Sequence, residues 1–162
     1  MNKGQLERDA ADVRVFPPAV PLVTVVAGII LDRIWPIAPA FAAPPPVRYI
    51  VGGMTIVGAF LLLGLWAVIT MRRTGQTENP YKPTTEIVAN GPFRVSRNPM
   101  YLQMVLVCLG FGILLWNVWI VLLTPVCAWV LHTFVILREE AYLEAKFGDG
   151  YIAYKRRVRR WL

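Results

Sequence analysis

Few side chains in this sequence can bind a metal or form a redox centre. The 162 residues include one histidine and two cysteines, and no C-x-x-C pair occurs. A zinc site built by one chain needs three or four such ligands at suitable spacing, so we expect no metal site. Cys108 and Cys127 both fall inside apolar stretches. We interpret them as buried thiols, with a disulfide as the less supported alternative.

Two patterns that would indicate common soluble proteins are also missing. No strand-like segment leads into a G-x-G-x-x-G, which excludes a Rossmann-type nucleotide site. The 17 basic and 10 acidic residues give a net charge of +7. However, no stripe of aromatic residues interleaves with the basic ones, so we expect no nucleic-acid binding. A mean hydropathy of +0.50 and 56% apolar residues are instead typical of a membrane protein.

Charges are absent from long stretches, and these stretches predict four membrane-spanning helices. The predicted spans cover about residues 15–33, 49–71, 99–116 and 118–137, and each is close to the roughly 20 residues that a bilayer requires. The last two are predicted to form a helical hairpin that turns at Trp116-Asn117. The proline-rich stretch 34–47 is interpreted as an extracytoplasmic loop. Its Ala40-Phe41-Ala42 is similar to a signal-peptide cleavage site, but the preceding Asp32-Arg33 argues against one.

The basic residues predict the orientation of these spans. Of the 17, 15 lie before the first span, in the 72–97 loop or from Arg138 onward, and only Arg33 and Arg48 lie elsewhere. Cytoplasmic segments carry the excess of Lys and Arg. We therefore predict an all-α, multi-pass integral protein of the cytoplasmic membrane, with both termini in the cytoplasm. It would form a single domain, 1–162, that ends in a cytosolic helical segment over 138–162.

Two polar clusters lie at the cytoplasmic ends of the last two predicted spans. The first, G-P-F-R-V-S-R-N-P-M-Y over residues 91–101, contains the helix-start signal Asn98-Pro99. A helix N-terminus beside Arg94 and Arg97 is suited to an anion. The second cluster is Arg138-Glu139-Glu140. Because a helical hairpin returns to the same side of the membrane, we expect the clusters to meet and hold one small zwitterionic cofactor.

Each of these features also has a purely structural interpretation. The arginines can set topology, and the glutamates can form a solvated helix exit. His132, within the fourth predicted span, is either a functional intramembrane group or a hydrogen-bonded packing residue. The tyrosines of the C-terminal segment, Tyr151 among them, can cover a bound ring or simply pack on the membrane surface.

The first cluster and the sequence R-E-E-A-Y-L-E-A-K-F-G-D-G-Y-I-A-Y-K-R-R-V-R together resemble the isoprenylcysteine carboxyl methyltransferase and phospholipid methyltransferase group of integral-membrane enzymes. The resemblance covers about residues 79–160. It implies S-adenosylmethionine-dependent methyl transfer to a lipid-like or lipophilic acceptor at the cytoplasmic membrane face. The R-x-P-x-Y core of the group corresponds to Arg97, Pro99 and Tyr101. Asn98 stands where the isoprenylcysteine enzymes usually have His, which favours the phospholipid type.

The resemblance implies roles for Arg97, Pro99, Tyr101 and the Glu139-Glu140 pair, and the two polar clusters and the predicted fourth span add further expected site residues. Cofactor binding is expected at Arg97, Asn98, Pro99, Tyr101, Glu139, Glu140 and Tyr151. A general base, needed only for a protonated acceptor, is expected to be Glu140, with Glu139 as the second choice. Acceptor binding is expected at Arg94, Arg138 and His132.

Other functions stay open at this stage. The acceptor atom can be oxygen, nitrogen or sulfur, and the expected partners are membrane lipids and the lipophilic acceptor. The alternative is a non-enzymatic four-helix membrane scaffold or lipid-binding protein. A small transporter is disfavoured because, apart from Asp32-Arg33 at the end of the first, the predicted spans contain no charged residues.

Overall fold

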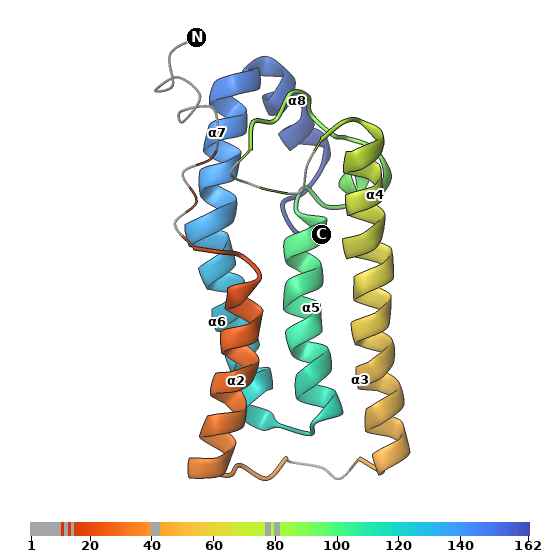
Figure 1. Ribbon diagram of the computed structural model, residues 1–162, viewed down its shortest axis with the longest axis vertical. Coiled ribbons are helices and arrows are strands. Elements are labelled where there is room, and N and C mark those ends of the chain that lie inside the picture. The colour runs from red at the N-terminus through yellow and green to blue at the C-terminus, as the bar shows by residue number, and fades with distance from the viewer. Residues whose placement is uncertain (1–10, 12, 14, 40–42, 77–78, 80–81) are drawn as a thin grey trace.

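The computed structural model describes residues 11, 13, 15–39, 43–76, 79 and 82–162. Within these ranges all regular structure is helical and no strand occurs, so the all-α prediction is confirmed. Four helical rods lie side by side, and short helices and loops cover one end of them (Figure 1). We call this covered end the cap.

The first and third rods are single helices, α2 (Ala19–Ile34) and α5 (Pro99–Leu114). The second rod consists of α3 (Pro45–Ala59), the π-helical segment η1 (Phe60–Leu65) and α4 (Trp66–Arg73). The fourth rod consists of α6 (Val118–Leu131), the π-helical segment η3 (His132–Ile136) and α7 (Leu137–Phe147). The cap contains the 3-10 helix η2 (Gly91–Arg94) and the terminal helix α8 (Asp149–Arg157).

Two of the rods are long and apolar enough to cross a membrane. In the part of the chain that the structure describes, these are Pro45–Arg73 and Val118–Phe147, which is fewer than the four predicted spans. The other two rods have 16 residues each. At 1.5 Å per residue they measure about 24 Å, which is short of a hydrocarbon core of about 30 Å.

Several helix boundaries differ from the predicted spans. The first helix begins at Ala19 instead of residue 15, because Pro17 and Pro18 form a turn before it. The second begins at Pro45 within the proline-rich stretch, since the first helical turn does not need the N–H that proline lacks. The fourth rod continues without a break to Phe147 instead of ending at residue 137. Residues 40–42, with the cleavage-like sequence, lie outside the described residues.

The predicted hairpin turn between the last two rods is confirmed. Leu114 ends one helix and Val118 begins the next. Trp116 adopts a positive φ of 55°, and the Asn117 N–H donates to the Gly112 carbonyl at 2.9 Å. The Asn117 side chain then accepts a hydrogen bond from the Ile120 N–H at 2.9 Å and caps the new helix. The turn returns the fourth rod towards the end at which α5 begins.

The core lies between α5 and its neighbours α2, α3 and α6. Cys108 and Cys127 are both buried there as free thiols, with their sulfur atoms 3.8 Å apart. Their interpretation as buried thiols is therefore confirmed. On the other side of α5, Gly52 of α3 lies against Gly110 and Leu114, and this close approach sets the spacing of the second and third rods.

A methyl group added at Gly52 would lie 2.6 Å from the Leu114 backbone nitrogen and 2.8 Å from the Gly110 carbonyl oxygen. We expect Gly52→Ala to lower the apparent unfolding temperature in detergent, because overpacking typically costs about 1–3 kcal/mol. Gly53→Ala is the matched control, since a Cβ at that position meets nothing within 4 Å. Equal unfolding temperatures for the two variants would contradict the close packing of α3 on α5.

Candidate functional site

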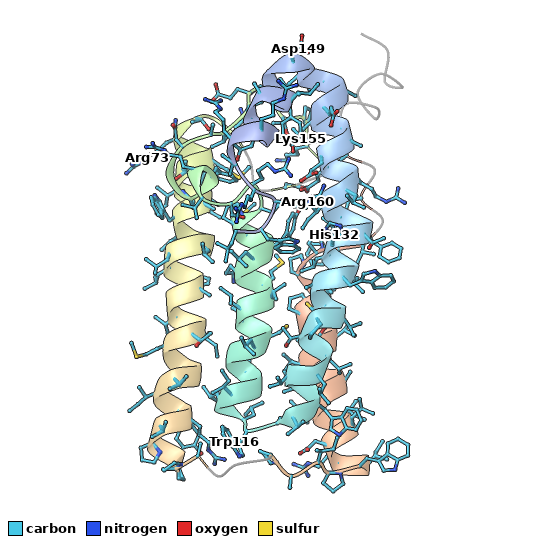
Figure 2. The ribbon with its side chains drawn as sticks, turned by 180° about the vertical axis from the view of Figure 1, so that it is seen from behind. Arg73, Trp116, His132, Asp149, Lys155 and Arg160 are labelled. Atoms are coloured by element: carbon cyan, nitrogen blue, oxygen red, sulfur yellow. The ribbon has the colours of Figure 1, made fainter. Side chains whose placement is uncertain are left out.

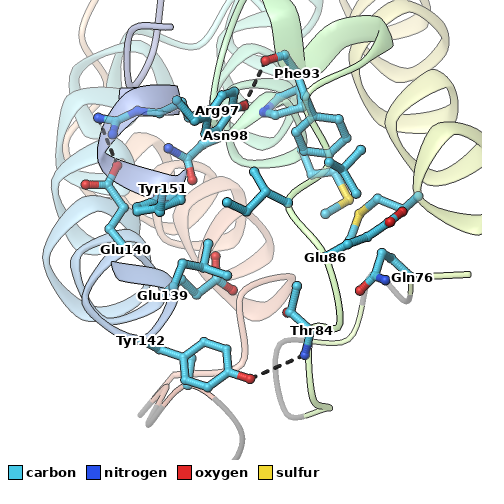
Figure 3. Close-up of a pocket in the computed structure, with 18 of the residues that line it drawn as sticks. Gln76, Thr84, Glu86, Phe93, Arg97, Asn98, Glu139, Glu140, Tyr142 and Tyr151 are labelled. Carbon is cyan, nitrogen blue, oxygen red and sulfur yellow. Dashed lines mark hydrogen bonds and ion pairs between the residues drawn. The ribbon is translucent and has the colours of Figure 1, made fainter. Parts of the chain in front are cut away.

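A pocket lies in the cap, beside the first residues of α5 (Figure 3). Its walls come from the end of the second rod, the loop before α5, the start of α5, α7 and α8. Its empty volume is about 900 Å³ including the open mouth. The hollow is concave and partly open to solvent, as small-molecule sites commonly are.

The two polar clusters meet at this pocket, as the sequence predicted. The Tyr101 hydroxyl of α5 donates a hydrogen bond to Glu139 Oε1 of α7 at 2.6 Å. Arg97 Nη2, just before α5, lies 3.1 Å from Glu140 Oε1. Figure 3 shows Arg97 and Glu140 pointing toward one another across the pocket wall. The hairpin and the unbroken fourth rod together produce this meeting.

Glu140 is the centre of a buried ion-pair network. The residue is only 4% exposed. Besides Arg97 it binds Arg160, whose Nε donates to Oε1 at 3.0 Å and whose Nη2 donates to Oε2 at 2.8 Å. Two guanidinium groups therefore hold one carboxylate, and the Arg160 contact has the bidentate geometry that makes such pairs strong. Both oxygens of the Glu140 carboxylate are therefore occupied by guanidinium donors.

Two nitrogen donors of Arg97 have no hydrogen-bond partner in the described part of the chain. Its side chain is 8% exposed, and it lines the pocket. Its Nη2 contacts Glu140, but its Nε and Nη1 are buried and have no hydrogen-bond partner among the described residues. A buried charged donor without a partner is costly. The arrangement is therefore suited to an anionic ligand group in the pocket.

Glu139 is a different kind of carboxylate from Glu140. It lies beyond the predicted span on α7 and lines the pocket. Burial raises its pKa from 4.5 to about 7; the Tyr101 hydrogen bond acts in the opposite direction, and the nearby Glu140 charge adds to the increase. A group that titrates near neutral pH can accept or release a proton under working conditions.

Asn98 has a different local role from the one predicted. It occupies the N-cap position of α5, but its side chain makes no capping hydrogen bond to the helix. Its Nδ2 instead donates to the Arg160 carbonyl at 3.1 Å. The helix start is thus fixed by Pro99 at its first position and by this contact with the C-terminal residues. The helix start predicted at Asn98-Pro99 is confirmed, although the Asn98 side chain bonds the returning chain and makes no capping hydrogen bond.

Aromatic side chains form another part of the wall. Phe93, Tyr151 and Tyr154 are buried and line the pocket. The Tyr154 hydroxyl donates to the Phe93 carbonyl at 2.7 Å, which attaches α8 to the loop before α5. At the mouth, the Thr84 N–H donates to the Tyr142 hydroxyl at 3.3 Å and connects the 82–90 loop to α7. Such a wall is suited to a flat ring.

The predicted residues fall into two groups. All seven predicted for cofactor binding line the pocket: Arg97, Asn98, Pro99, Tyr101, Glu139, Glu140 and Tyr151. The three predicted for acceptor binding do not line it. Arg94 is exposed at the end of η2, Arg138 lies on α7 before the glutamates, and His132 begins η3, where its ring stacks on Trp161 at 6.5 Å. Their acceptor role stays a prediction.

Sequence reasoning missed several residues of the site. Phe93 lies inside the first cluster but was not singled out, although its motif position offered a signal. Arg160, which binds Glu140, was not singled out in the sequence. The loop residues Thr84, Ile87 and Val88 carry no motif, and only the folded chain brings them to the pocket.

The comparison with protein families agrees with this geometry. A model of the phospholipid methyltransferase family matches residues 47–150, more than half of the chain. The chain belongs to the phospholipid methyltransferase family. A protein of Haemophilus influenzae described as uncharacterised is 46% identical over 63 residues, which make up 39% of this chain and all of that protein. No solved structure matches the chain. Membership of the family indicates a membrane-associated methyltransferase that acts on a lipid-like substrate.

The raised pKa of Glu139 predicts a specific pH dependence of stability. Between pH 4.5 and about 7 the folded protein holds a proton that the unfolded chain has lost, so stability falls as the pH rises. We expect the free energy of unfolding of Glu139→Gln to exceed that of the parent protein by a margin that grows with pH, from near zero at pH 4.5 to about 3 kcal/mol at pH 8. Unfolding in detergent at several pH values measures this difference. A difference that does not change with pH would contradict the assignment.

Proposed function

We propose that this chain transfers a methyl group from S-adenosylmethionine to a lipid-like acceptor, with the cofactor held in the cap pocket. The observation that carries the proposal is the pair of unpartnered, buried donors on Arg97. Arg97 lines the pocket next to the N-terminus of α5, and a helix N-terminus favours negative charge. The cofactor has one carboxylate, and this corner of the pocket matches it.

The other walls are chemically suited to the rest of the cofactor. Glu139 can accept hydrogen bonds from its ammonium or ribose hydroxyl groups. The aromatic wall formed by Phe93, Tyr151 and Tyr154 is suited to adenine, because a flat apolar ring gains contact area against other rings. Positive, negative and aromatic surfaces thus lie around one pocket, as a zwitterionic nucleoside requires.

When bound, S-adenosylmethionine supplies an electrophilic methyl group. The residues of this chain then act chiefly by binding and orientation, which supply much of the rate of a group transfer. Glu140 serves to hold Arg97 in place. For an acceptor that carries a proton, we assign proton removal to the Glu139 carboxylate. Its pKa of about 7 is better matched to this task than a carboxylate already bound by two guanidinium groups.

We also propose that all four rods span the membrane, with the cap in the cytoplasm. Arg73, Lys155 and Arg160 lie at the cap end, whereas Trp116 lies at the opposite end (Figure 2). The excess of basic residues at one end supports this orientation. The short rods can be accommodated because bilayers thin locally around short helices.

Single cysteines test this topology in a background without Cys108 and Cys127. Ala38→Cys and Asn90→Cys place a thiol at an exposed residue on either end of the bundle. We expect a membrane-impermeant maleimide to label position 38 in intact cells, and position 90 only after the cells are opened. Labelling of both positions from the same side would contradict the four-span proposal.

Calorimetry with S-adenosylhomocysteine on detergent-purified protein tests the cofactor site. We expect binding by the parent protein and at least a tenfold loss of affinity in Arg97→Gln, because the carboxylate loses its charged donors. Arg156→Gln is the matched control. It removes the same charge from an exposed residue of α8 that does not line the pocket, and its affinity is expected to stay unchanged.

The outcomes separate the enzyme from its main alternative. Absence of binding by the parent protein at millimolar ligand would favour the non-enzymatic scaffold or lipid-binding protein, which family membership does not favour. If Arg97→Gln binds the ligand with unchanged affinity, the proposed activity stands, but the cofactor carboxylate binds at a different part of the protein.

A further inference from the structure

The last five residues, 158–162, return from α8 across the start of α5, and we call them the strap. The Arg97 N–H donates to the Arg159 carbonyl at 3.0 Å. The Arg160 carbonyl accepts hydrogen bonds from Ser96 Oγ at 3.3 Å and from Asn98 Nδ2 at 3.1 Å. Trp161 stacks on His132 of the fourth rod. The strap is therefore attached to the start of the third rod and to the fourth rod. Figure 2 shows Arg160 between these two rods.

Arg160 of the strap determines the net charge of the part of the pocket formed by Arg97 and Glu140, which we call the pocket corner. Arg97, Arg160 and Glu140 form one connected group, with two positive charges and one negative. With Arg160 present the group has a net charge of +1, which favours an incoming carboxylate. Without it, Arg97 and Glu140 would cancel. Two other acidic groups of the described residues line the pocket: Glu139, which is hydrogen-bonded to Tyr101 and would add negative charge when it ionises, and Glu86 of the 82–90 loop.

Arg160 also decides which donors Arg97 retains. In the structure Glu140 directs Oε2 to Arg160 and shares Oε1 between both guanidinium groups. Arg97 therefore contacts Glu140 through Nη2 alone. If Arg160 were absent, Glu140 Oε2 would lose its partner inside a buried site. The remaining nearby guanidinium is Arg97, and a bidentate pair between them would use donors that are now unoccupied.

We propose that Arg160 is a positioning residue for the cofactor: by holding Glu140 in a bidentate pair, it leaves Arg97 charged, oriented and open to the ligand's carboxylate. Arg160 itself does not line the pocket and acts through its neighbours. The inference rests on the proposed function. It assigns to the C-terminal residues a role in ligand affinity, in addition to the attraction of their charge to a membrane surface.

A charge-rescue experiment distinguishes positioning from simple structural support. Calorimetry with S-adenosylhomocysteine is carried out on the full-length parent protein, Arg160→Gln, Arg160→Lys and the double variant Arg160→Gln/Glu140→Gln. We expect at least a tenfold loss of affinity in Arg160→Gln and a smaller loss in Arg160→Lys, which keeps the charge without the fork. The double variant is expected to bind more tightly than Arg160→Gln, because a neutral amide at position 140 does not cancel the charge of Arg97 and its oxygen can still accept from Arg97 Nη2.

The control is Arg159→Gln, which removes an adjacent exposed charge and keeps the backbone carbonyl that Arg97 contacts; it is expected to bind like the parent protein. Unfolding temperatures without ligand identify variants that lose affinity by unfolding. If Arg160→Gln does not fold, Arg160→Lys and the double variant decide the question. Unchanged affinity in Arg160→Gln, or no recovery in the double variant, would overturn the inference while the proposed function stands. Lack of binding by the parent protein would instead remove the proposed function.

Discussion

The buried carboxylate of Glu140 is the constraint on which the arrangement of the cap depends. A charge with 4% exposure must be paired, because an isolated one would cost several kcal/mol. Its partners come from two distant parts of the chain, Arg97 before α5 and Arg160 near the C-terminus. Pairing one acidic group with both therefore requires the fourth rod, the start of the third rod and the strap to converge. The pocket is the space that this convergence leaves beside α5.

The two adjacent glutamates show how position on one helix produces two chemistries. Successive residues of a helix point about 100° apart, so one side chain faces the arginines and the other faces Tyr101. Glu140 is held by two guanidinium groups, whereas Glu139 accepts a hydrogen bond from a tyrosine hydroxyl and has a raised pKa. Glu140 holds the Arg97 guanidinium in position, and Glu139 can exchange a proton. Family membership gives this pair a context in methyl transfer to lipid-like substrates.

The features predicted from sequence were those that depend on local pattern or simple connectivity. The turn at Trp116-Asn117 followed from an uncharged stretch too long for one span, and the meeting of the clusters followed from that hairpin. Helix ends were less well predicted where proline was involved: Pro45 begins a helix, although its neighbourhood was interpreted as loop. The roles of Asn98 and Arg160 depend on the path of the returning chain after Gly148, where φ is 51°. No periodicity or motif specifies that path.

The unbroken fourth rod has a mechanical consequence. It passes from the apolar bundle into the cap without a loop at the membrane surface, and it carries both glutamates on its far end. A continuous helix transmits vertical displacement along its axis, and Pro125 and the π-helical η3 are the points at which this one can bend. In the proposed four-span arrangement, the thickness of the surrounding bilayer would then bear directly on how far the acidic pair lies from Arg97 and Tyr101. In that arrangement, lipid composition would affect the geometry of the proposed cofactor site.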